Sequence, residues 1–130
     1  MTRYYNLRYI NHVGLTIVKL KISNPSDKTK SRTVEFLVDS GALYSFVNKN
    51  ILRDVGIKPE AVKEFVMANG EFVKRKIGIA RYHYKRTTGG APVVFAEPGD
   101  TNLLGATTLE SLGLMLNPFK REIIPLSLTM

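Results

Sequence analysis

The segment VEFLVDSGA, residues 34–42, places a carboxylate at the end of an apolar strand. Leaving an unpaired carboxylate in apolar surroundings is costly, so Asp39 calls for a specific explanation. Gly41 allows the backbone to turn sharply and another segment to approach closely. The Ser40 hydroxyl can donate and accept a hydrogen bond across a packed interface. The apolar residues before Asp39 and the alanine after Gly41 make this match more specific than Asp-Ser-Gly alone.

The residues before and just after this segment predict strands with one brief helix. Residues 15–23 alternate apolar and basic side chains, as in a half-buried strand. Turn residues follow at 24–28, and a second strand is predicted at 33–38, so that residues 24–32 form an inserted loop. A strand at 44–47 then leads into a helix capped by Asn48 or Asn50 and ended by Gly56.

The middle of the chain predicts a hairpin. Residues 62–68 and 72–84 are β-prone and flank Asn69-Gly70, a dipeptide that favours a two-residue type I′ turn. A turn is predicted at 87–90 because it reads Thr-Thr-Gly-Gly, and a strand at 91–96.

The C-terminal part predicts a helix between short strands. The apolar segment Leu103-Leu104-Gly105 precedes Thr107 to Glu110, whose capping-box spacing predicts a helix that stops at Gly113. Strands are predicted at 114–116 and 123–128. The sequence therefore predicts one mostly β domain over residues 1–130, with one or two short helices.

Composition narrows the possible chemistry. The chain has no cysteine, which excludes disulfides, thiolate catalysis and cysteine-ligated metals. His12 and His83 are isolated in sequence, so we expect no metal and no cofactor. The N-terminus lacks an apolar run typical of a signal peptide, and no stretch approaches the roughly 20 apolar residues that span a bilayer. We therefore expect a cytoplasmic protein that does not contact membranes.

The formal charge of +8 raises the alternative of a nucleic-acid-binding β-domain. The basic residues are scattered over several predicted strands and turns, in pairs and triplets such as 74–76. This distribution favours solvated strand faces and protected sheet edges over a nucleic-acid surface.

Three segments together resemble the retropepsin-like, or retroviral-type, aspartic proteases. LVDSGA at 37–42 is similar to the active-site loop of that family, in which an apolar pair precedes Asp-Thr/Ser-Gly-Ala/Ser. NLLG at 102–105 resembles the family's apolar-apolar-Gly segment, which a short helix follows. Residues 66–78 lie where the family places its flap, a hairpin that closes over substrate. The order of these segments across residues 15–128 resembles a single-domain, prokaryotic-type member.

The resemblance implies a fold, an activity and a set of site residues. The implied fold is a retropepsin-like closed β-barrel or sandwich with a flap hairpin and one or two short helices, active as a two-fold homodimer. The implied activity is hydrolysis of peptide bonds in peptide or protein substrates. The implied catalytic residues are Asp39, Ser40 and Gly41, and the implied substrate-binding residues are Ala42, Met67, Ala68, Asn69 and Gly70.

Carboxylate-catalysed hydrolysis needs a general base and a general acid, which two adjacent aspartates provide by sharing one proton. The chain carries one Asp-Ser/Thr-Gly, because Asp27, Asp54 and Asp100 lack that context. A homodimer would supply the second Asp39. The resemblance implies the same arrangement, with Ser40 hydroxyls bonding across the two-fold axis. We expect the terminal strands, residues 4–10 and 123–128, to pair at the interface.

Two departures from retroviral members affect these expectations. Those members carry an acid after Asp-Thr-Gly-Ala and an arginine after the apolar-apolar-Gly, where this chain has Leu43 and Ala106. Both partners of that ion pair are absent together, so neither leaves an unpaired charge. An inactive or weakly active dimer of the same fold that binds peptides is therefore an alternative.

Overall fold

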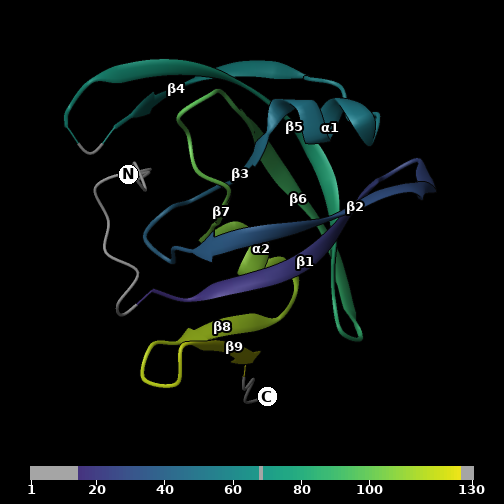
Figure 1. The fold of residues 1–130 in the computed structure, drawn as a ribbon, viewed down its shortest axis with the longest axis vertical. Helices are drawn as coiled ribbons and strands as arrows, with labels where there is room; N and C mark the ends of the chain where they lie inside the picture. The colour runs from purple at the N-terminus through teal and green to yellow at the C-terminus, as the bar shows by residue number, and fades with distance from the viewer. Residues whose placement is uncertain (1–14, 68, 127–130) are drawn as a thin grey trace.

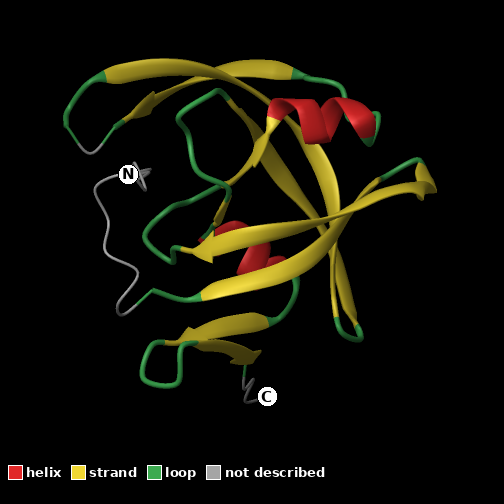
Figure 2. Ribbon diagram, in the orientation of Figure 1, coloured by secondary structure: helices red, strands yellow, loops and turns green. Residues whose placement is uncertain are grey.

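The computed structural model describes residues 15–67 and 69–126, and β-strands dominate them (Figures 1 and 2). The strands and the two helices are β1 (Ile17–Asn24), β2 (Asp27–Val38), β3 (Ser45–Asn48), α1 (Lys49–Asp54), β4 (Ala61–Val66), β5 (Phe72–Tyr84), β6 (Thr87–Ala96), β7 (Leu103–Leu104), α2 (Ala106–Ser111), β8 (Leu114–Asn117) and β9 (Glu122–Pro125).

Seven strands form one sheet in the order β1-β2-β7-β3-β6-β5-β4. β1 also pairs with β5, through Lys21 to Ser23 against Arg81 to His83, so that six strands close into a ring and β4 extends from β5. β8 and β9 form a separate two-stranded sheet below the ring in Figure 1. A mostly β, barrel-like fold with two short helices is therefore confirmed.

The core fills the inside of the ring. Alternation in β1 buries Leu20 and Ile22 and leaves Lys19 exposed, as the sequence pattern predicts. Phe36 from β2 and Tyr82 from β5 pack beside them at 6.4 Å between ring centroids. Burial raises the pKa of Tyr82 well above its usual range, which keeps this phenol protonated.

The prediction of an inserted loop at residues 24–32 is wrong. β2 begins at Asp27 and pairs with β1 from there onwards, across a tight turn. The residues that start β2 are polar on both faces, so hydrophobic alternation could not reveal a strand. The turn is fixed from outside by the Asn24 side-chain amide, which donates to the carbonyls of Val55 and Gly56 at 3.1 and 3.0 Å.

Two turn predictions are also wrong in detail. The β5–β6 turn is Lys85-Arg86, with Lys85 at φ +52°, while Thr87 to Gly90 continue as strand. A Cβ at Gly89 would lie 2.7 Å from the Ser111 carbonyl oxygen, so glycine allows α2 to approach the strand. At the β4–β5 tip, Met67 accepts from the Gly70 amide and donates to Glu71, so three residues, not two, form the loop.

The helix signals were correct at α1 and partly wrong at α2. The Asn48 side chain accepts from the Asn50 amide at 2.8 Å, and Gly56 follows the helix at φ +78°, as predicted. α2 begins earlier than the capping-box spacing predicts, at Ala106, and its N-cap is Gly105. The Thr107 amide donates to the Leu43 carbonyl at 3.1 Å, so a separate segment replaces the capping side chain.

The structure describes only part of the terminal strands that were predicted to pair at the interface. Residues 4–10 and 127–128 lie outside the described residues. β9 pairs with β8, joining Ile123 to Leu116 and Ile124 to Met115, which confirms a strand in the predicted region. In the described part of the chain, no helix has the length and apolar character to cross a membrane.

A partly buried polar contact joins the two strands that close the ring. Ser23, which is fully buried in β1, bonds to Nε2 of His83 in β5 at 2.7 Å. Burial, and then the neighbouring charges of Lys21, Arg81 and Lys28, lower the pKa of His83 below its usual value. A neutral His83 therefore accompanies the closed ring at neutral pH.

We predict that acidification destabilises the fold through His83. As the pH falls below the unfolded pKa of 6.5, the unfolded chain binds a proton that folded His83 still resists, so unfolding becomes easier. Urea unfolding between about pH 8 and pH 5 should show the wild type losing stability relative to His83→Gln, which cannot titrate. Parallel pH profiles for the two proteins would contradict this role.

Candidate active site

Asp39 follows the last residue of β2, where the backbone is held by the strand beside it. β2 runs parallel to β7, which pairs Leu37 with Leu103 and Val38 with Leu104. The Asp39 amide donates to the Leu104 carbonyl at 3.0 Å. The position of Asp39 is therefore set by backbone bonds to a segment more than sixty residues later in the chain.

The Asp39 carboxylate has one satisfied and one unsatisfied oxygen. Oδ1 accepts from the Gly41 amide at 2.9 Å, and the Asp39 carbonyl accepts from the Ala42 amide at 3.1 Å. Oδ2 is buried and has no hydrogen-bond partner, the one such side-chain atom in residues 15–67 and 69–126. Buried polar atoms are almost always paired, so an orphaned carboxylate oxygen calls for a partner beyond the described residues.

The residues after Asp39 present a mixed surface. Ser40 and Gly41 are exposed, Ala42 is fully buried, and Leu43 is 47% exposed. The predicted catalytic residues therefore share one loop, and the Ser40 hydroxyl is accessible to a second molecule.

Gly105 allows a second segment to wrap this loop. A Cβ at Gly105 would lie 2.5 Å from the Tyr44 carbonyl oxygen and 3.0 Å from that of Ala42. The Ala106 amide donates to the Ala42 carbonyl at 2.8 Å. Glycine at position 105 therefore allows this segment to pack closely against the Asp39 loop.

Two buried hydroxyl groups, which were not predicted from the sequence, also hold the Gly105 segment against the Asp39 loop. Ser45 Oγ accepts from the Gly105 amide at 3.0 Å and lies 2.6 Å from Thr108 Oγ1. Both side chains are fully buried. The sequence did offer one signal for this contact. Ser45 is a polar residue between the apolar Tyr44 and Phe46, and a buried hydroxyl needs a hydrogen-bond partner.

The β4–β5 hairpin lies on the same side of the molecule as the Asp39 loop (Figure 1). Phe65 in β4 meets Tyr44 edge-on, with ring centroids 6.3 Å apart, and Phe46 at 5.4 Å. Met67 also packs on this cluster, while Asn69 and Gly70 are exposed at the tip. Ala68 lies outside the described residues. Aromatic packing therefore links the hairpin to the residues that follow Asp39.

A buried ion pair anchors the hairpin at its other end. Arg75 in β5 donates to both carboxylate oxygens of Asp100, at 2.8 and 3.1 Å, and their side chains are 15% and 2% exposed. Asp100 also accepts from the Glu97 amide at 2.9 Å. No local sequence signal indicates that two residues twenty-five positions apart form an ion pair. This bond was therefore not predicted from the sequence.

The described residues hold no group of three or more His, Cys, Asp or Glu side chains that could bind a metal ion.

The chain belongs to the aspartyl protease family, of the retropepsin-like type: a family model described as "Aspartyl protease" matches residues 18–108, well over half of the sequence. The match runs from β1 into α2 and contains Asp39, the β4–β5 hairpin and Gly105. Comparison with curated protein sequences gave no match.

We predict that Gly105→Ala destabilises the protein by about 1–3 kcal/mol, because the new methyl would displace backbone atoms of the Asp39 loop. Gly90→Ala is the matched control, since its Cβ would meet nothing closer than the Ala80 carbonyl oxygen at 3.9 Å. Chemical denaturation should show a loss for the first variant and a change below about 0.5 kcal/mol for the second. Equal effects would disprove the close-packing role.

Proposed function

We propose that this protein is an aspartic endopeptidase that acts as a homodimer, with one Asp39 from each subunit forming the catalytic dyad. The observation that carries this proposal is the buried Asp39 Oδ2, which accepts a hydrogen bond from none of the residues that the structure describes. Membership of the aspartyl protease family supports hydrolysis of peptide bonds as the reaction.

The other aspartates support the need for a second chain, because each has a local task. Asp27 accepts from the amide and hydroxyl of Thr29 at the solvent-exposed start of β2. Asp54 pairs with Arg32 at 3.1 Å, and Asp100 is held by Arg75, as described above. Since the chain has four aspartates, no second acid of this kind remains for Asp39 within one subunit. A two-fold axis beside Asp39 would supply an identical one.

The proposed reaction uses the two carboxyl groups in different protonation states. Two like charges in contact cannot both ionise, so the pair retains one proton. The ionised Asp39 removes a proton from water while the water oxygen attacks the peptide carbonyl carbon, and the protonated Asp39 gives its proton to the carbonyl oxygen. The carbon–nitrogen bond of the tetrahedral intermediate then breaks as the amine takes a proton from one carboxyl group of the dyad. One hydroxyl of the intermediate gives its proton to the other carboxylate, which forms the carboxylic acid product and restores the single proton of the dyad.

The same proposal places an extended peptide between the β4–β5 hairpin and the Asp39 loop. Main-chain pairing with a strand-like substrate is a common recognition mode for such a groove. Ala42, which is fully buried, would support the floor from beneath. Met67, Ala68, Asn69 and Gly70 would contribute to the cover. The exposed Leu43 would offer apolar surface beside the dyad.

Asp39→Asn should lower the rate of peptide cleavage by at least about 10²–10⁴-fold, because the amide can neither accept nor supply the proton. Asp27→Asn is the matched control and should retain activity, since the Asp27 carboxylate makes exposed hydrogen bonds at the start of β2. Cleavage of a peptide library by purified protein should show this difference, with activity greatest at mildly acidic pH. Equal cleavage by Asp39→Asn and wild type, or activity still rising above neutral pH, would contradict the dyad.

Mixing subunits tests the dimer separately. A ninefold excess of Asp39→Asn should lower wild-type activity by about tenfold, because most wild-type subunits would then sit in mixed dimers with an incomplete dyad. The same excess of Asp27→Asn should cause no inhibition. Unchanged activity with excess Asp39→Asn, after time for exchange, would show that one chain suffices. A pepstatin-type inhibitor that binds without any turnover of peptides would instead support a peptide-binding dimer.

A further inference from the structure

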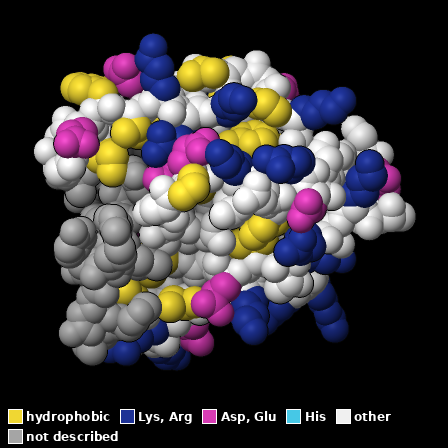
Figure 3. Space-filling model, turned by 45° about the horizontal axis from the view of Figure 1, so that its top comes forward, with side chains coloured by type: hydrophobic (Ala, Val, Ile, Leu, Met, Phe, Trp, Pro, Cys, Tyr) yellow, Lys and Arg dark blue, Asp and Glu magenta, His cyan; other side chains and the backbone are white. Residues whose placement is uncertain are grey.

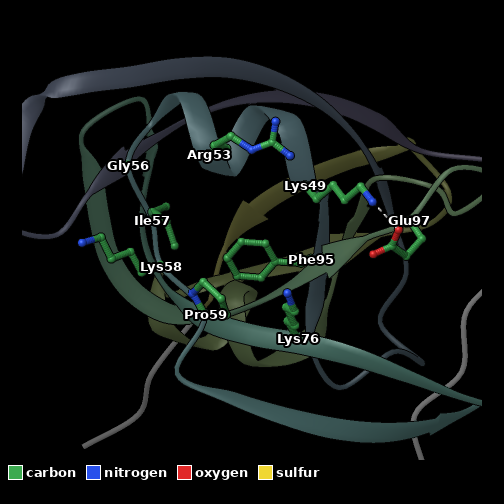
Figure 4. Close-up of a pocket in the computed structure, with 9 residues that line it drawn as sticks. All are labelled: Lys49, Arg53, Gly56, Ile57, Lys58, Pro59, Lys76, Phe95 and Glu97. Carbon is green, nitrogen blue, oxygen red and sulfur yellow. Dashed lines mark hydrogen bonds and ion pairs between the residues drawn. The ribbon is translucent and has the colours of Figure 1, made fainter.

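A pocket of about 400 Å³ lies beneath α1 (Figure 4). None of its lining residues belongs to the Asp39 loop, the hairpin tip or the Gly105 segment. The residues that line it come from α1, the segment after it, β5 and the end of β6: Lys49, Arg53, Gly56, Ile57, Lys58, Pro59, Lys76, Phe95 and Glu97.

The charge of this pocket is unbalanced. Four of its residues are cationic and one, Glu97, is anionic. Glu97 is engaged by Lys49 at 2.6 Å. Among the described residues, Arg53, Lys58 and Lys76 have no carboxylate within salt-bridge distance. Several like charges gathered at a concave surface attract an anion, and the low-dielectric walls strengthen that attraction.

The positions of the cations suit a ligand that enters the pocket. In Figure 4, the ring of Phe95 lies between Arg53, which extends from α1, and Lys76, which approaches from β5. Lys58 lies at the rim and points outward in the same view. On this face, Figure 3 shows Lys and Arg side chains around apolar ones. An anion held between Arg53 and Lys76 would therefore rest beside an aromatic ring.

The pocket wall is fixed by close packing rather than by exposed side chains alone. A Cβ at Gly78 would lie 2.7 Å from the Lys58 carbonyl oxygen and 3.3 Å from Phe95 Cε1. Glycine therefore lets the segment after α1 pack directly on β5. The Ile57 amide donates to the Leu52 carbonyl at 3.0 Å, and the Glu60 amide donates to that of Ile77 at 2.8 Å. These bonds hold the wall in one place before any ligand binds.

We propose that this pocket binds a small organic phosphate. A phosphate dianion matches the uncompensated cations better than a monocarboxylate does, and the guanidinium of Arg53 can bind two of its oxygens at once. The floor of Phe95 and Ile57, with Pro59 beside it, would contact an apolar or aromatic body. The volume lies within the range typical of small-molecule sites. This site does not depend on the proposed peptidase activity.

Phenyl phosphate is a suitable probe, because it joins a phosphate dianion to an aromatic ring. In ¹H–¹⁵N spectra of the full chain, saturable shifts should centre on residues 53–58, 76 and 95. Benzoate, which carries one charge, and inorganic phosphate, which has no ring, should each bind more weakly. The double variant Arg53→Ala/Lys76→Ala should weaken phenyl phosphate binding by at least about tenfold, through loss of two charge-assisted bonds.

Lys19→Ala/Lys120→Ala is the matched control, because it removes the same charge from exposed positions on β1 and the β8–β9 turn. This control should bind as the wild type does, and thermal unfolding should show that all the proteins fold. Shifts spread over all basic residues, equal weakening in both double variants, or no saturable binding would each overturn the proposal. Peptide cleavage is not part of the readout, so failure here would leave the proposed peptidase function untouched.

Discussion

The structure depends on how the backbone around Asp39 is held. β7 lies between β2 and β3 and pairs with both, so the chain that leaves β2 must pass around the end of β7 before it enters β3. Gly105 occupies that end, where any side chain would collide with the Tyr44 carbonyl. Contacts between segments that are distant in the sequence therefore fix the orientation of the Asp39 carboxylate. The same contacts hold the backbone after β2 and the backbone at Gly105.

Much of this arrangement could be predicted from the sequence, because the chemistry that defines it is local. An apolar strand ending in Asp-Ser-Gly identified the loop, and the apolar pair before Gly105 identified the segment that packs on it. The half-buried β1 and the capped α1 were also predictable, since alternation and Asn48 are read from neighbouring residues. Family resemblance then related the separate segments to one another.

Prediction from the sequence failed where tertiary contacts, and not local sequence signals, determine the structure. The polar start of β2 has no alternation, and pairing with β1 makes it a strand. Gly89 suggested a turn, yet it lies in a strand that accommodates α2. The Arg75–Asp100 pair and the contact of Phe65 with Tyr44 join residues that only the folded chain brings together. Such contacts are set by topology, which periodicity alone does not encode.

The edge-on packing of Phe65 on Tyr44 and Phe46 makes the hairpin and the Asp39 loop a coupled pair. Lifting β4 away from the barrel would separate the three rings and expose apolar surface to water, which disfavours an open hairpin. Arg75 would resist the same movement from the opposite end of the hairpin through Asp100. In the proposed peptidase, a peptide that enters beneath the hairpin would replace these aromatic contacts with its own, which favours substrates with apolar side chains at that point.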